Sequence, residues 1–155
     1  MTSIYSHTNL VARDWQRLSA FYQTVFGCMR IGESRDLRGA WLDRLTGIEG
    51  VHVVGEHLRL PGYGDAGPTL EIFSYEPAGM ESRLMPNATG FAHIAFAVDD
   101  VPATLQHLLA EGGSQVGELI WQRYDDGRTL TAVYARDPEG NMVEIQHCAR
   151  ETGPA

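Results

Sequence analysis

The sequence predicts an α+β fold built from two βαβββ modules, and two observations carry this prediction. The first is an internal repeat: the segment SHTNLVARDWQRLSAFYQTVFG at 6–27 has the same pattern as AHIAFAVDDVPATLQHLLAEGG at 92–113. The second is that strand-like stretches follow each copy of the repeat. An internal repeat indicates a duplicated supersecondary unit, so both halves of the 155-residue chain are expected to fold alike.

Each copy of the repeat has the pattern of a strand, an aspartate cap, an amphipathic helix and a terminating glycine. When His7 is aligned with His93, the aspartate cap and the terminating glycine of the two copies coincide. They are Asp14 and Gly27 in the first copy, and Asp100 and Gly113 in the second. Apolar residues recur every three or four positions after each cap, which is the spacing of one helix face. These residues are Trp15, Leu18, Phe21, Tyr22, Val25 and Phe26 in the first copy, and Val101, Leu105, Leu108 and Leu109 in the second.

The remaining strands follow each helix in turn. After the first helix they are predicted at 28–33, 51–60 and 69–74, with a short helix at 37–45. After the second they are predicted at 115–122, 129–136 and 141–147. The domain organisation is therefore a first module at 1–76, a linker at 77–90, a second module at 91–148 and a tail at 149–155.

Composition excludes several classes of function. The chain has 12 Lys+Arg against 20 Asp+Glu, so no basic surface is expected for nucleic acid or an anionic membrane. All the basic residues are arginines, which rules out a Schiff-base lysine or a P-loop. No signal peptide or membrane span is predicted, and Cys28 and Cys148 are expected to be reduced thiols. These features together predict a cytoplasmic protein.

The chemistry is expected on the sheet faces that the two amphipathic helices leave uncovered. Strand alternation places His7 and Glu71 on that face in the first half, and His93 and Glu144 in the second. Both glutamates have aliphatic neighbours, in L-E-I and V-E-I, and a carboxylate there is costly unless it meets a cation. Two imidazoles with two carboxylates suit a borderline divalent ion such as Ni, Co, Zn, Mn or Fe.

Three motifs resemble the vicinal oxygen chelate superfamily, which includes glyoxalase I and methylmalonyl-CoA epimerase. They are H-T-x-L-x-x-x-D-x-x-R-x-x-x-F-Y from His7, G-F-A-H-I-A-F-A-V-D-D from Gly90, and R-D-P-E-G-N-M-V-E-I from Arg136. The resemblance implies a U-shaped mixed sheet around a metal, commonly in a homodimer, with His7, Glu71, His93 and Glu144 as the ligands. Ring-cleaving dioxygenases of the superfamily leave the position of Glu71 without a ligand, so the glyoxalase and epimerase branch is favoured.

The predicted function is a divalent-metal-dependent epimerase, isomerase or lyase that acts on a small carbonyl substrate through an enolate. Zn, Ni, Co or Mn is expected rather than Fe. Glu144 and Glu71 are the candidate bases. Asn9, near His7, and Arg59, which shares a strand face with His57, are candidate substrate-binding residues, although a solvated arginine is an open alternative. A protein that sequesters a small molecule and an Fe(II)-dependent ring-cleaving dioxygenase remain as alternative functions.

Overall fold

The computed structural model describes residues 3–80 and 85–150 of the chain. These residues form two compact units, Met1–Glu81 and Ser82–Ala155, and each unit is described here by itself. The division falls inside the predicted linker, of which 81–84 lie outside the described residues. Of the predicted tail, 151–155 also lie outside them.

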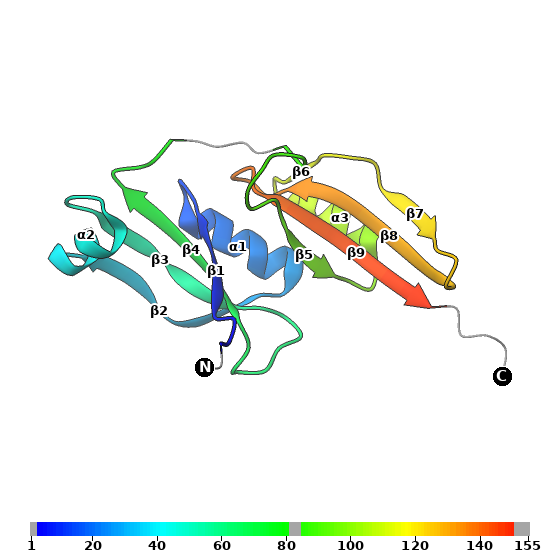
Figure 1. Cartoon of the computed structure of the whole chain (residues 1–155), viewed down its shortest axis with the longest axis horizontal. Coiled ribbons are helices and arrows are strands. Elements are labelled where there is room, and N and C mark those ends of the chain that lie inside the picture. Colours follow the sequence, from blue (N-terminus) through cyan, green and yellow to red (C-terminus); the bar gives the residue numbers. More distant parts are fainter. Residues whose placement is uncertain (1–2, 81–84, 151–155) are drawn as a thin grey trace. The chain divides into compact units, whose positions relative to one another are not determined.

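The first unit is a four-stranded mixed sheet with two helices (Figure 1). In chain order its elements are β1 (His7–Val11), α1 (Trp15–Phe26), β2 (Met29–Arg38), α2 (Ala40–Thr46), β3 (His52–Arg59) and β4 (Thr69–Glu76). The strand order is β1-β4-β3-β2. Strand β1 runs parallel to β4, whereas β3 is antiparallel to both β4 and β2.

The second unit repeats this topology. Its elements are β5 (Ile94–Ala97), α3 (Val101–Ala110), β6 (Ser114–Gln115), β7 (Ile120–Arg123), β8 (Arg128–Arg136) and β9 (Met142–Arg150). The strand order is β5-β9-β8-β6, with β5 parallel to β9, and β7 also pairs with β8. The single strand predicted at 115–122 is therefore two short strands. The predicted α+β fold of two βαβββ modules is confirmed.

The helix caps follow the sequence signals closely. The carboxylate of Asp14 accepts a hydrogen bond from the backbone N–H of Arg17 at 3.0 Å, and Asp100 does the same for Ala103 at 2.8 Å. Gly27 ends α1 in the left-handed conformation with φ 69°, where a side chain would be strained. Helix α3 ends at Ala110, earlier than its predicted glycine stop.

Helix α1 covers one face of the first sheet with an apolar core. This core contains Leu18, Phe21, Tyr22 and Phe26 from the helix, and Leu58, Leu70 and Ile72 from β3 and β4. Glu56 is buried on the same face, where it accepts a hydrogen bond from Ser19 and pairs with Arg30 at 3.1 Å between Nε and Oε2. The buried carboxylate is thus compensated by a hydroxyl and a guanidinium, as a charge in the core requires.

The other face of the first sheet is covered at one end, which the sequence analysis did not predict. Leu42 of α2 packs with Val51, Val53 and Phe73 in a separate apolar cluster. This cluster exists because α2 lies in an insertion between the edge strand β2 and the inner strand β3. Glu71 lies on the same face of β4 as Phe73, two residues before it.

The end of the last strand in the second unit differs from the sequence prediction. Strand β9 continues to Arg150, so Cys148 and the start of the predicted tail belong to the strand rather than following it. The extension is stabilised by β8, because Arg150 pairs with Arg128 and Ala149 pairs with Thr129. None of the helices in the described parts of the chain is long and apolar enough to cross a membrane.

The two free cysteines are expected to differ in reactivity. Cys28 is buried, and this burial raises the pKa of its thiol to about 12, whereas Cys148 is exposed. The reactive species is the thiolate. At pH 8 a thiol reagent should therefore label Cys148 quickly in the folded protein, and both Cys28 and Cys148 in urea. Rapid labelling of both in the folded protein would contradict this.

The raised pKa of Cys28 also predicts a pH dependence of stability. The folded protein favours the neutral thiol, so this contribution to stability is complete below the unfolded pKa, near 9. It is lost as the pH rises towards the folded pKa of about 12. The free energy of unfolding in urea is measured for the wild type and for Cys28→Ala at pH 8 and at pH 10. The wild type should lose more stability than the variant between these two pH values.

Candidate functional site: two histidine–glutamate pairs

The first unit brings together the predicted residues His7 and Glu71. The Nε2 atom of His7 lies 3.4 Å from Oε2 of Glu71. The parallel register of β1 and β4 places Asn9 directly opposite Glu71, and the amide nitrogen of Asn9 donates to Oε2 at 3.4 Å. Glu71 is only 13% exposed, whereas His7 is 45% exposed. The pair is therefore a partly buried carboxylate with a more accessible imidazole.

The local sequence explains this arrangement. Along β4, Leu70 and Ile72 are buried on the face of the sheet that α1 covers. Because successive side chains in a strand point to opposite faces, Glu71 must project from the other face. The alternation that buries the aliphatic neighbours is thus what presents the carboxylate.

The second unit contains the matching pair. The Nε2 atom of His93 lies 3.1 Å from Oε2 of Glu144, and Glu144 is 18% exposed. His93 immediately precedes β5 rather than lying within it, which differs from the prediction. On β9, Val143 and Ile145 are fully buried, so Glu144 projects from the opposite face of its sheet, as Glu71 does in the first unit.

A third imidazole, which the sequence analysis did not assign to the site, lies beside Glu71. The antiparallel register of β3 and β4 places His57 opposite Glu71, with His57 Nε2 3.3 Å from Oε1. Burial lowers the pKa of His57 below its usual range, the Glu71 carboxylate opposes this shift, and Arg35 and His7 add to it. The alternation of β3 showed that His57 and Arg59 share a face, but only the register shows what His57 contacts.

Arg59 lies on β3, two residues beyond His57, and its guanidinium forms an ion pair. One guanidinium nitrogen contacts Asp65 at 2.8 Å. Its Nε atom is buried and has no hydrogen-bond partner among the described residues. A buried donor without an acceptor is costly, so this position is suited to an acceptor from a bound molecule.

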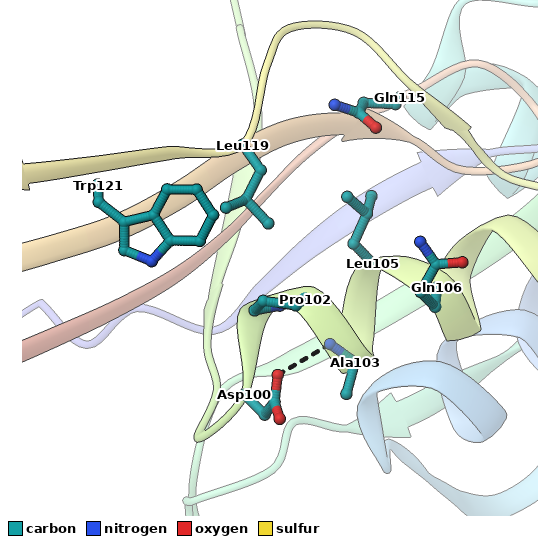
Figure 2. A pocket seen from close by; sticks show the side chains of 8 residues that line it. All are labelled: Asp100, Pro102, Ala103, Leu105, Gln106, Gln115, Leu119 and Trp121. Carbon is teal, nitrogen blue, oxygen red and sulfur yellow. Dashed lines mark hydrogen bonds between the residues drawn. The ribbon is translucent and has the colours of Figure 1, made fainter.

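The described part of the chain also contains an open pocket of about 510 Å³ in the second unit, away from the predicted residues. Figure 2 shows that it lies between the start of α3 and the segment that leads into β7. Its lining residues are Asp100, Pro102, Ala103, Leu105, Gln106, Gln115, Leu119 and Trp121. None of them is a predicted site residue, and the pocket is on the helix side of its sheet.

The two pairs fit a divalent metal by the chemistry of their donors. Each combines an imidazole nitrogen and a carboxylate oxygen, which face each other within 3.4 Å and 3.1 Å. Among residues 3–80 and 85–150, no three His, Cys, Asp or Glu side chains are grouped as a metal site. Since a protein metal site commonly uses three or four protein ligands, one pair alone is an incomplete set.

Comparisons with known proteins agree with the fold. The family model described as the Glyoxalase/Bleomycin resistance protein/Dioxygenase superfamily matches residues 4–145. A protein named lactoylglutathione lyase from Haemophilus influenzae is 27% identical over 139 residues, which cover 90% of this chain and 88% of that protein.

Two solved structures show the same fold. A glyoxalase family protein from Bacillus cereus has a TM-score of 0.80 at 20% identity, with 96% of both chains covered. A mutant of the fosfomycin resistance protein FosX from Listeria monocytogenes has a TM-score of 0.56 at 17% identity, covering 95% of this chain and 93% of that one. That crystal structure contains Mn(II) and 1S,2S-dihydroxypropylphosphonic acid.

Proposed function

Because the chain belongs to the Glyoxalase/Bleomycin resistance protein/Dioxygenase superfamily, we propose that it is a divalent-metal-dependent epimerase, isomerase or lyase. Its reaction begins with the removal of a proton next to a substrate carbonyl. The observation that carries the proposal is the matched pair of an imidazole and a carboxylate in each unit. The name of the Haemophilus influenzae relative, a lactoylglutathione lyase, supports the same class of reaction.

We propose that His7, Glu71, His93 and Glu144 are the metal ligands. Zn, Ni, Co and Mn all accept imidazole and carboxylate ligands, and the Mn(II) bound to the Listeria protein supports this set of ions. When bound, such an ion supplies Lewis-acid stabilisation of the negative charge that develops on a carbonyl oxygen.

The glutamates supply the acid–base chemistry. A carboxylate oxygen of Glu144 or Glu71 takes the α-proton as the C–H bond breaks, and then returns it. Delivery of a proton to the opposite face of the same carbon by the other glutamate, in its protonated form, would give an epimer, whereas return of the proton to the adjacent carbon would give an isomer. Both carboxylates are partly buried, which limits competing proton exchange with water.

Arg59 and Asn9 bind the substrate in this proposal. A guanidinium matches a carboxylate or phosphate group, and the Nε atom of Arg59 has no acceptor in the described structure. Asn9 places its amide at Oε2 of Glu71, beside one of the two candidate bases. The substrate class that fits is therefore a small carbonyl compound with an anionic group.

The proposal is tested by metal analysis followed by proton–deuteron exchange. The purified protein is loaded with each of Zn, Ni, Co and Mn and incubated in D₂O with 2-hydroxy-ketones and 2-substituted thioesters. Each compound is used in a neutral and a carboxylate-bearing form. We expect deuterium at the α-carbon, detected by NMR, with faster exchange in the anionic form.

Two results would favour the alternative functions. Tight binding of a panel compound without any deuterium entering it would indicate a protein that sequesters small molecules. Oxygen uptake that depends on Fe(II) would indicate a dioxygenase. Deuterium exchange, binding and Fe(II)-dependent oxygen uptake, measured with the same set of compounds, together separate the three functions.

A further inference from the structure

We infer that His57 is a positioning residue that holds the Glu71 carboxylate by its second oxygen and so pre-organises the first unit for metal binding. This inference rests on the proposed function, because it concerns Glu71 as a metal ligand. It assigns a role to an imidazole that is additional to the four ligands proposed above.

Glu71 is contacted at both of its carboxylate oxygens. Its Oε2 atom lies 3.4 Å from both His7 Nε2 and Asn9 Nδ2, and its Oε1 atom lies 3.3 Å from His57 Nε2. Asn9 and His57 are the register partners of Glu71 on the two neighbouring strands, β1 and β3. The carboxylate is thus contacted from both sides of its own strand, and rotation would cost contacts at both oxygens.

The His57 ring is itself held in place. It makes an edge-on contact with Phe73, with the ring centroids 5.7 Å apart. Phe73 is buried in the apolar cluster that includes Leu42 of the insertion helix α2. The His57 side chain is 23% exposed. Its imidazole contacts Phe73 on one side and Glu71 on the other. Because packing against Phe73 already restricts the His57 side chain, its contact with Glu71 costs less side-chain entropy than the same contact from an unpacked ring would.

The second unit lacks these two supports at the matching positions. The residue opposite Glu144 on β8 is Tyr134, whose ring lies against His93 with centroids 5.1 Å apart. The residue opposite Glu144 on β5 is Ala95, whose side chain has no hydrogen-bonding group. The surroundings of the two glutamates therefore differ. Glu71 is contacted by a side-chain nitrogen from each neighbouring strand, whereas in the second unit the Tyr134 ring packs against His93.

A hydrogen-bond donor that orients a ligand carboxylate commonly contributes 10- to 100-fold to metal affinity. Removal of the His57 N–H should therefore weaken metal binding by about that factor. A side chain that keeps an N–H at the same reach should restore it. Glutamine provides such a group, because its amide nitrogen corresponds in position to Nε2 of histidine.

The experiment measures Co(II) binding to the full chain by competition with a coloured chelator, together with the visible absorption of bound Co(II). His57→Leu and His57→Met remove the donor but keep an apolar side chain beside Phe73, so the comparison does not depend on one variant folding. His57→Gln is the rescue variant. His107→Leu is the control, because His107 is half-exposed on α3 and contacts Glu111.

We expect His57→Leu and His57→Met to bind Co(II) about 10- to 100-fold more weakly, with an altered Co(II) spectrum. His57→Gln should bind within about threefold of the wild type, and His107→Leu should bind like the wild type. Unchanged affinity in the apolar variants would overturn the inference, as would a glutamine variant that binds as weakly as they do. Absence of Co(II) binding by the wild type would instead defeat the proposed function.

Discussion

Replacing Glu144 or Glu71 by glutamine is expected to lower the rate of proton–deuteron exchange by about 10²–10⁴-fold in the variant that has lost the base. Glutamine has nearly the same shape and keeps an oxygen that can bind a metal, but its amide cannot accept the α-proton at neutral pH. The measurement is the exchange rate at saturating substrate, with metal content determined on the same sample.

The two variants also show which glutamate is the base. The substitution that removes the base lowers exchange while metal remains bound, whereas the substitution that removes only a ligand mainly lowers metal affinity. Glu111→Gln, at the C-cap of α3, is a matched control, since this glutamate is exposed and contacts His107. If both variants kept their metal and exchanged at the wild-type rate, neither carboxylate would be the base.

Gly55→Ala is expected to have the largest effect on stability. A Cβ atom at Gly55 would lie 2.0 Å from the carbonyl oxygen of Ile72 and 2.8 Å from Cα of Phe73. Both are backbone atoms of β4, which is paired on both sides, so neither can move away without loss of sheet hydrogen bonds. We expect the free energy of unfolding to fall by about 3 kcal/mol, at the upper end of overpacking effects.

Urea unfolding measures this effect. Gly64→Ala is the control, because a Cβ at Gly64 would meet no atom within 4 Å. The control should unfold within about 0.5 kcal/mol of the wild type. An equally small change for Gly55→Ala would show that β3 and β4 do not approach as closely as described. His57 lies two residues along β3 from Gly55, and the same strand pairing places it opposite Glu71.

Part of this structure could be predicted because the signals are local. The N-caps at Asp14 and Asp100 act within one helical turn, and strand alternation acts between adjacent residues. Alternation also placed each histidine on the same face as its glutamate, and the short His7–Glu71 and His93–Glu144 distances agree with that placement. The family followed from three motifs placed along the chain between His7 and Ile145, and the family model confirms it.

Other features depend on contacts between distant segments, and local signals do not contain them. The burial of Glu56 is possible only because Ser19 and Arg30 reach it from other elements. Helix α2 covers part of one sheet face because of where the insertion between β2 and β3 packs. The length and composition of this insertion do not specify where it packs.

The amino-acid sequence by itself determined the duplicated architecture, the capped helices and one imidazole–carboxylate pair in each half. The tertiary structure alone decided that His57 faces Glu71 while Tyr134 faces Glu144. The physical reason is strand register: alternation fixes the face on which a side chain lies, whereas its neighbours across the sheet depend on how separate strands align.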